Sequence, residues 1–158
     1  RDAIADLDDP LERLGGAMVA ATSMAQFSEE GLDRGLARLR LRLAESSPDL
    51  VGRAQEAITS LVRALVAEAA TAGRVEVDDP DAAAFLLLSL NAAFITSDRL
   101  GNDTGVPRPD GHEVVAFCLR GLGADVDPAW VASVGGRLRL PSRRAGRAPL
   151  GRPRKPRR

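Results

Sequence analysis

Four dipeptides in this sequence mark the starts of α-helices. Each places a capping residue before a proline: Asp9-Pro10, Ser47-Pro48, Asp79-Pro80 and Asp127-Pro128. The capping side chain accepts hydrogen bonds from the first free backbone N–H groups of the helix, and proline at the first helical position has no N–H to satisfy. With further starts at Ser28 and near Gly111, the pattern predicts helices over residues 10–25, 28–45, 48–72, 80–99, 111–120 and 128–134.

Aromatic residues make up only 3% of the 158 residues, so the core must consist mainly of Leu, Val and Ala. That composition favours helices packed on helices, and the length favours one domain. We therefore predict an all-α fold, an antiparallel bundle of five to six helices over residues 1–136. Gly15-Gly16 inside the first helix predicts a kink or a close approach of another segment, of which tight packing is favoured, and Gly73 predicts a left-handed helix end.

The formal net charge of zero conceals a division of charge along the chain. Residues 137–158 hold ten Arg or Lys and no acid, which leaves 12 bases against 22 acids in residues 1–136. The acidic body is a poor candidate for binding nucleic acid. Residues 137–158 are also rich in Pro and Gly, and such a segment buries too little apolar surface to fold, so we expect a disordered tail.

The segment Ala82–Ile95 is apolar on nearly every side, since Ser89 and Asn91 are its only polar residues. A helix of this kind must be covered on nearly all sides. At 14 residues the segment is too short to span a bilayer, so we expect protein to cover it, including a second subunit.

The order of these pieces resembles the carboxy-terminal regulatory domain of the TetR/AcrR family of bacterial transcription factors. The resemblance covers about residues 8–123 and depends on arrangement more than on an invariant motif. It is carried by Ser47-Pro48-Asp49-Leu50, Ala72-Gly73-Arg74, Asp79-Pro80, the run 82–88 (AAAFLLL) and the run 117–123 (FCLRGLG).

The resemblance implies an Ω-shaped homodimer whose subunits each enclose a small-molecule pocket. It further implies that helices 80–99 and 111–121 pair with their twofold mates as a four-helix bundle. The family's amino-terminal helix-turn-helix head is not in this sequence, which begins at Arg1, so we expect the chain to be part of a longer protein. The interface residues implied are Phe85, Leu86, Leu88, Ala92, Val114, Phe117 and Cys118.

Candidate ligand contacts are polar or soft side chains on otherwise apolar helix faces, because small-molecule sites are mostly apolar with a few hydrogen-bonding groups. For each residue taken singly, ordinary core or interface packing is the favoured interpretation, although a buried Asn91 amide must find a partner in a ligand, a water or its twofold mate. The candidates are Met18, Thr22, Met24, Phe27, Asn91, Phe94 and Thr96.

The sequence offers little for catalysis or metal binding. His112 is the only histidine and Cys118 the only cysteine, which is too few nitrogen and sulfur ligands for a zinc site. Cys118 on an apolar face is interpreted as a small buried hydrophobe. We expect no enzyme activity, no metal and no cofactor. With no signal peptide and no uncharged run of about 18 apolar residues, we also expect a cytoplasmic protein without membrane contact.

The tail contains the run 151–156 (GRPRKP), which looks like a degenerate AT-hook. Such a strip lays arginines in the narrow minor groove of A·T-rich DNA, and here Arg152, Arg154 and Lys155 would do so. Leu150 stands where an arginine is expected before the glycine. A merely solubilising or incidental tail is the favoured interpretation, followed by loose attraction to phosphates and then by specific minor-groove binding.

Together these features predict an effector-sensing and dimerisation domain of a TetR-like regulator. A small lipophilic effector would enter the bundle and change the spacing of DNA-reading heads. The alternative is a helical dimerisation module without a ligand, whose basic tail contacts nucleic acid or an acidic partner.

Overall fold

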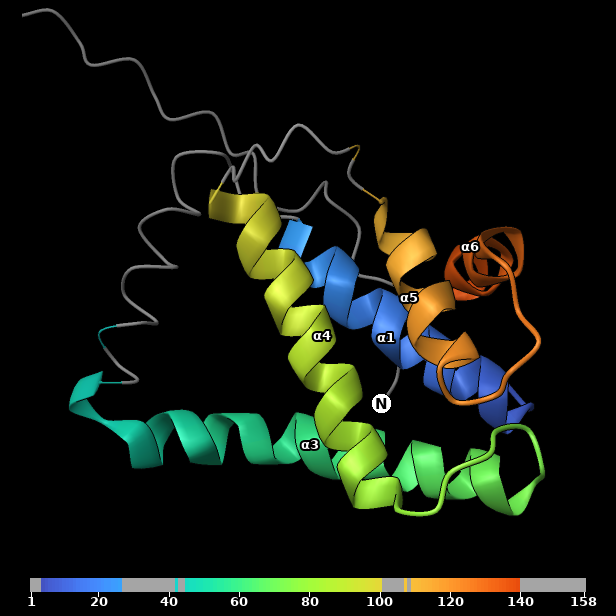
Figure 1. Ribbon diagram of the computed structural model, residues 1–158, viewed down its shortest axis with the longest axis horizontal. Helices are drawn as coiled ribbons and strands as arrows, with labels where there is room; N and C mark the ends of the chain where they lie inside the picture. Colours follow the sequence, from blue (N-terminus) through green and yellow to red (C-terminus); the bar gives the residue numbers. More distant parts are fainter. Residues whose placement is uncertain (1–3, 27–41, 43–44, 101–106, 108, 140–158) are drawn as a thin grey trace, which may run out of the picture.

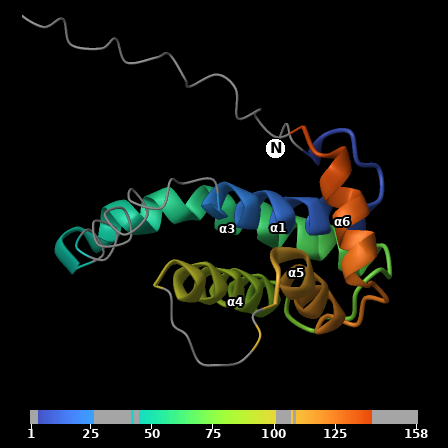
Figure 2. The same cartoon turned by 90° about the horizontal axis from the view of Figure 1, so that it is seen from above.

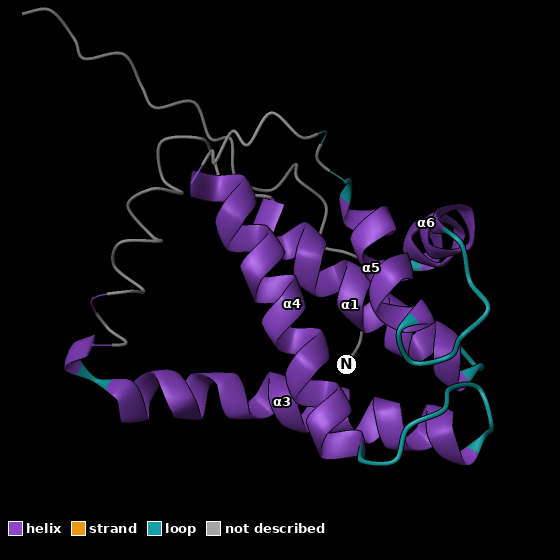
Figure 3. Cartoon of the chain, viewed as in Figure 1, coloured by secondary structure: helices purple, strands orange, loops and turns teal. Residues whose placement is uncertain are grey.

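The computed structural model describes residues 4–26, 42, 45–100, 107 and 109–139. Within these residues the secondary structure is entirely helical, which confirms the all-α prediction (Figure 3). The predicted helix over 28–45 lies almost wholly outside the described residues. The described helices are α1 (Pro10–Gln26), α3 (Pro48–Thr71), α4 (Pro80–Leu100), α5 (Gly111–Arg120) and α6 (Pro128–Arg137).

Helix α1 is the central element, because it packs against each of the other four helices in the described part of the chain (Figure 1). Seen from above, α1 and α3 form one layer, while α4 and α5 lie together on one side of it (Figure 2). The core between the layers is aliphatic, as the composition predicted. Its largest fully buried side chains are Leu14, Met18, Val66, Val115, Leu119, Val131 and Val134.

Three of the four predicted caps form as expected. The Asp9, Asp79 and Asp127 carboxylates each accept a hydrogen bond from a backbone N–H two or three residues ahead. Ser47 makes no side-chain cap bond, although Pro48 follows it. Asp110 instead forms a reciprocal capping box with Glu113 at the start of α5, in which each side chain accepts from the other's backbone N–H.

The paired glycines of α1 mark tight packing, which confirms the favoured interpretation. A Cβ on Gly15 would lie 3.1 Å from the Trp130 ring of α6, and a Cβ on Gly16 would lie 2.9 Å from Leu7 and 3.0 Å from Leu138. Gly73 has φ +65, as a left-handed helix end requires.

The boundary of the folded body lies further along the chain than predicted. Helix α6 continues to Arg137, and Leu138 is half-buried against the core. Arg137 pairs with Glu12 at 2.5 Å, and Arg139 pairs with Asp6 at 2.8 Å. These three residues, expected in the tail, therefore belong to the body because they extend its packing over α1. The rest of the tail, residues 140–158, lies outside the described residues.

Candidate binding sites on the two sides of helix α4

The inner side of α4 carries a buried polar pair, which we define as Thr22 of α1 and Asn91. Each side chain is 3% exposed, and they are the buried polar residues of the described chain. The Thr22 Oγ1 lies 3.1 Å from Asn91 Oδ1 and 2.9 Å from the backbone oxygen of Met18. The pair therefore links α1 to α4 inside otherwise apolar surroundings.

The hydrogen bonding of the polar pair follows from the chemistry of a hydroxyl. Thr22 has a single hydrogen to donate, so it cannot donate to both nearby oxygens. The hydroxyl therefore donates either to the Met18 carbonyl oxygen within α1 or to Asn91 Oδ1 on α4.

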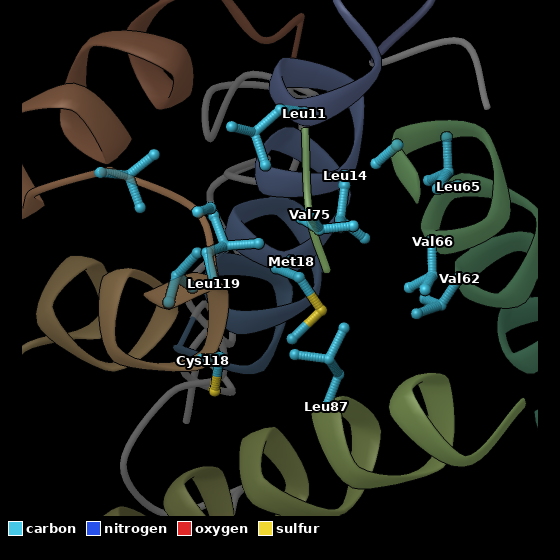
Figure 4. Close-up of a cluster of buried hydrophobic side chains, with 14 of the residues drawn as sticks. Leu11, Leu14, Met18, Val62, Leu65, Val66, Val75, Leu87, Cys118 and Leu119 are labelled. Atoms are coloured by element: carbon cyan, nitrogen blue, oxygen red, sulfur yellow. The ribbon is translucent and has the colours of Figure 1, made fainter. Parts of the chain in front are cut away.

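The core around the polar pair is apolar and contains a flexible methionine side chain. Met18 has no exposed surface, and in Figure 4 its thioether points toward Leu87 of α4. A methionine side chain has several rotatable bonds and adapts its shape to a neighbour at low cost. The inner side of α4 thus has a hydrogen-bonding amide, and the neighbouring apolar surface includes a methionine that can change its shape.

Three of the seven predicted ligand contacts come together here, namely Met18, Thr22 and Asn91. Phe94, one turn further along α4 from Asn91, is half-buried. Thr96 is exposed, so it is not brought to the polar pair, because its position on α4 faces away from the core. Phe27 and the side chain of Met24 lie outside the described residues.

The outer side of this layer carries an apolar face, which we define as Phe85, Leu86 and Leu90 of α4 with Phe117 of α5. These side chains are 68%, 58%, 47% and 65% exposed, respectively. Helices α4 and α5 pack against each other and share one layer (Figure 2). Monomeric proteins rarely leave large apolar side chains gathered in this way, and such surfaces usually mark interaction sites.

Four of the seven predicted interface residues are exposed: Phe85, Leu86, Ala92 and Phe117. Leu88 and Val114 are half-buried and pack against the core. Cys118 is only 4% exposed and lies in the core of the subunit, which corrects its assignment to the interface. It neighbours Phe117 in sequence, but successive helical residues point in directions about 100° apart.

Leu90 was missed by the sequence analysis although it belongs to the apolar face. It lies four residues after Leu86, and this spacing places two side chains on the same side of a helix. The signal was present, but a helix apolar on nearly all sides gives no polar stripe from which to tell its inner and outer faces.

The described residues show no arrangement suited to catalysis. Burial raises the pKa of the Cys118 thiol, which keeps it in the unreactive protonated form near neutral pH. His112 is half-buried at the start of α5 beside Gly135 of α6. Among the described residues, no group of three or more His, Cys, Asp or Glu side chains could hold a metal ion.

Helix α4 is long and apolar enough over Pro80–Ser97, by length and composition alone, to cross a membrane. The sequence analysis considered only Ala82–Ile95, which is 14 residues long and too short to span a bilayer. With the flanking residues of the helix, the apolar stretch reaches 18 residues. The inner side of α4 packs against α1, α3 and α5. Core helices of globular domains that are mostly buried also have this length and composition, whereas only 22% of Pro80–Ser97 is buried inside the described chain.

Neither a protein-family model, nor a curated protein, nor a solved structure matches this chain. The resemblance to TetR/AcrR regulatory domains therefore depends on the residues and helix order given above.

Proposed function

We propose that this chain is the effector-sensing and homodimerisation domain of a TetR-like transcriptional regulator. The observation that carries the proposal is the apolar face. It lies on α4 and α5, the two helices that the resemblance assigns to the contact between subunits. Two of its members, Phe85 and Phe117, are among the most exposed large apolar side chains described.

The size of the apolar face fits a contact between two copies. Burying a side chain such as Phe or Leu that is half to two-thirds exposed contributes roughly 1–2 kcal/mol. A symmetric dimer buries the face of both copies, which amounts to roughly 8–16 kcal/mol for eight side chains. Association of two folded proteins costs about 4–15 kcal/mol, so the gain is of the same size as the cost.

Helix α4 connects effector binding to dimerisation in this proposal. Asn91 lies on its inner side and Leu90 on its outer side, in consecutive positions. A lipophilic effector that entered between α1 and α4 would take over a hydrogen bond of the polar pair and shift α4 against α1. The shift would move the apolar face and, through it, the relative placement of DNA-reading heads in the longer protein.

The coupling requires an effector with different affinities for the two arrangements of α4. The polar pair supports an effector with an apolar body and one hydrogen-bonding group. Decanol, decanoic acid and decanamide are suitable probes, because they share one chain and differ in that group. Decane serves as the matched control without a hydrogen-bonding group.

A thermal-shift series on the full chain tests the sensing function. At a concentration 100 times its Kd, a ligand that binds only the folded state stabilises it by about 2.7 kcal/mol. We expect at least one of the three probes with a hydrogen-bonding group to raise the Tm more than decane does. In the Asn91→Leu variant, that probe and decane should raise the Tm by the same amount. If every probe leaves the Tm unchanged while the chain still dimerises, the chain is a dimerisation module without an effector.

A further inference from the structure

The outward side of α4 is centred on Ser89. Ala84, Leu87 and Asn91 lie on the opposite side of the helix and are buried. At about 100° per residue, six further exposed side chains lie within about 60° of Ser89 around the helix axis, and Leu90 lies at the edge of this side. The six are Ala82, Phe85, Leu86, Ala92, Ala93 and Thr96.

Large and small side chains are separated along this outward side. Phe85 and Leu86 come before Ser89 and are 68% and 58% exposed. In packed helices, four residues at the spacing i, i+3, i+4, i+7 surround one side chain that inserts from the facing helix. Helix α4 therefore carries both large side chains to insert and small residues that can receive them. The small residues at this spacing are Ser89, Ala92, Ala93 and Thr96.

This separation fits a second copy of α4 that runs in the antiparallel direction. A twofold axis at Ser89 places residues three or four positions before it beside residues three or four positions after it in the partner subunit. Phe85 then packs on Ala92 of the partner subunit, and Leu86 packs on the partner's Ala93. In a parallel pair each residue would face its own copy, so the large side chains would crowd at one end and the small residues would leave a gap at the other.

The chemistry of the outward side also favours an identical helix as its partner. No residue from 82 to 97 carries a charge. Asp81, which directly precedes this stretch, pairs with Arg63 of α3 at 2.6 Å and is thus engaged within the subunit. A partner that docks through ion pairs would find no charge to pair with along this stretch, whereas a second copy of α4 brings none that needs a partner.

We propose that α4 pairs with its twofold mate in the antiparallel direction, with the axis at Ser89 and with Phe85 and Leu86 inserted among the partner subunit's small residues. The inference rests on the proposed function, in which the apolar face joins two copies, and it specifies the register of that contact. Asn91 is two residues from Ser89, or about 3 Å along the helix axis. A movement of α4 at the polar pair therefore acts at the centre of the contact.

Cysteine cross-linking of the full chain tests the register. A disulfide needs Cα atoms about 4.4–6.8 Å apart, so we expect Ser89→Cys at the axis to form a covalent dimer on oxidation. The matched control Ala82→Cys should form none, because its two copies lie about 21 Å apart along antiparallel helices. An equimolar mixture of Ala82→Cys and Thr96→Cys should cross-link, since these positions lie equally far from the axis on opposite sides. The wild type serves as the blank, because the native Cys118 is buried.

An exchange of side-chain sizes tests the packing independently. Phe85→Ala removes the inserted side chain, and Ala92→Phe fills the place that Phe85 should occupy. Each variant is expected to raise the Kd of the dimer about tenfold or more in sedimentation equilibrium. The double variant Phe85→Ala/Ala92→Phe exchanges the two roles and should return to within about threefold of the wild-type Kd. Both positions are exposed in the subunit, so circular dichroism should show every variant folded.

Four outcomes would overturn the inference: a covalent dimer from Ala82→Cys alone, none from Ser89→Cys in a chain that dimerises, a double variant in which the two losses simply add, or binding to phospholipid vesicles in place of dimerisation. These failures are distinguishable from failure of the proposed function. A wild type that dimerises but fails the cross-linking or the exchange loses only the register. A wild type that is monomeric in sedimentation loses the proposed function as well.

Discussion

At the scale of single residues, the Thr22–Asn91 hydrogen bond is the feature of the core that apolar packing does not explain. Both side chains are 3% exposed, and burial of an amide is unfavourable unless it is hydrogen-bonded. A leucine at position 91 would fill a similar volume without that requirement. The hydrogen bond therefore favours one placement of α1 against α4, and the amide is the group that we propose an effector would engage.

A double-mutant cycle measures the contribution of this hydrogen bond. Thr22→Val and Asn91→Leu are each expected to lower the free energy of unfolding by about 1–3 kcal/mol, since each removes one partner of a buried hydrogen bond and leaves the other polar side chain without it. The double variant should lose less than the sum by about 0.5–1.5 kcal/mol. Urea denaturation provides the measurement, and strictly additive losses would show that the two side chains do not interact.

The glycines of α1 and α3 give a second prediction at this scale. Gly52→Ala should raise the free energy of unfolding by about 0.5–1 kcal/mol, because nothing lies within 4 Å of its Cβ position and alanine favours a helix. Gly15→Ala receives the same gain but crowds the Trp130 ring, so it should be about 1–3 kcal/mol less stable than Gly52→Ala.

Fluorescence of Trp130, the single tryptophan of the chain, adds a direct readout of the crowding. Its emission should change in the Gly15→Ala variant and stay unchanged in Gly52→Ala. Equal stability and equal emission in the two variants would contradict the tight contact between α1 and α6.

At the scale of elements, the described helices could be predicted from the sequence because their starts carry local signals. Asp9, Asp79 and Asp127 act through hydrogen bonds to residues two or three positions ahead, so a short stretch of sequence contains the whole interaction. The end of α6 could not be predicted in this way. Arg137, Leu138 and Arg139 are held by Glu12, Gly16 and Asp6, which lie more than 100 residues away in the sequence.

The starts of α6 and α3 allow a paired prediction, because both have a capping residue followed by proline but only Asp127 of α6 makes the cap bond. Asp127→Ala should lower the free energy of unfolding by about 1 kcal/mol, because Asp127 Oδ1 accepts a hydrogen bond from the Trp130 backbone N–H at 2.7 Å. Ser47→Ala should change it by only a few tenths of a kcal/mol, because Ser47 makes no cap bond. Chemical denaturation of both variants checks this, and an equal loss would contradict the difference between the two caps.

At the scale of the whole molecule, the candidate site is divided between the two sides of one helix. The sequence identified Met18, Thr22 and Asn91 on the inner side because polar or soft residues on apolar helices are conspicuous. It assigned the outer side less well: Leu90 was missed and Cys118 was included, since the nearly uniform apolar character of residues 82–95 conceals which side the core occupies. Only the packing of α4 on α1 and α3 separates the two sides.

The two sides of α4 are the reason for proposing a regulator instead of a simple structural module. A dimerisation helix needs an apolar outer side, but it does not need a buried amide opposite that side. The combination places a candidate sensing group and a candidate dimer contact on one rigid element, so a movement of one is a movement of the other. This arrangement is the central claim, and it depends on association through the apolar face.

Sedimentation equilibrium of the full chain, from about 1 to 50 μM, tests that claim most directly. The account predicts a dimer for the wild type, a dimer for the control Ala132→Glu on the exposed side of α6, and a folded monomer for Phe85→Glu/Phe117→Glu, because each new carboxylate would be buried without a partner at the interface. Circular dichroism verifies that each variant is helical. A folded wild-type chain that is monomeric throughout, or a double variant that still dimerises, would contradict the account.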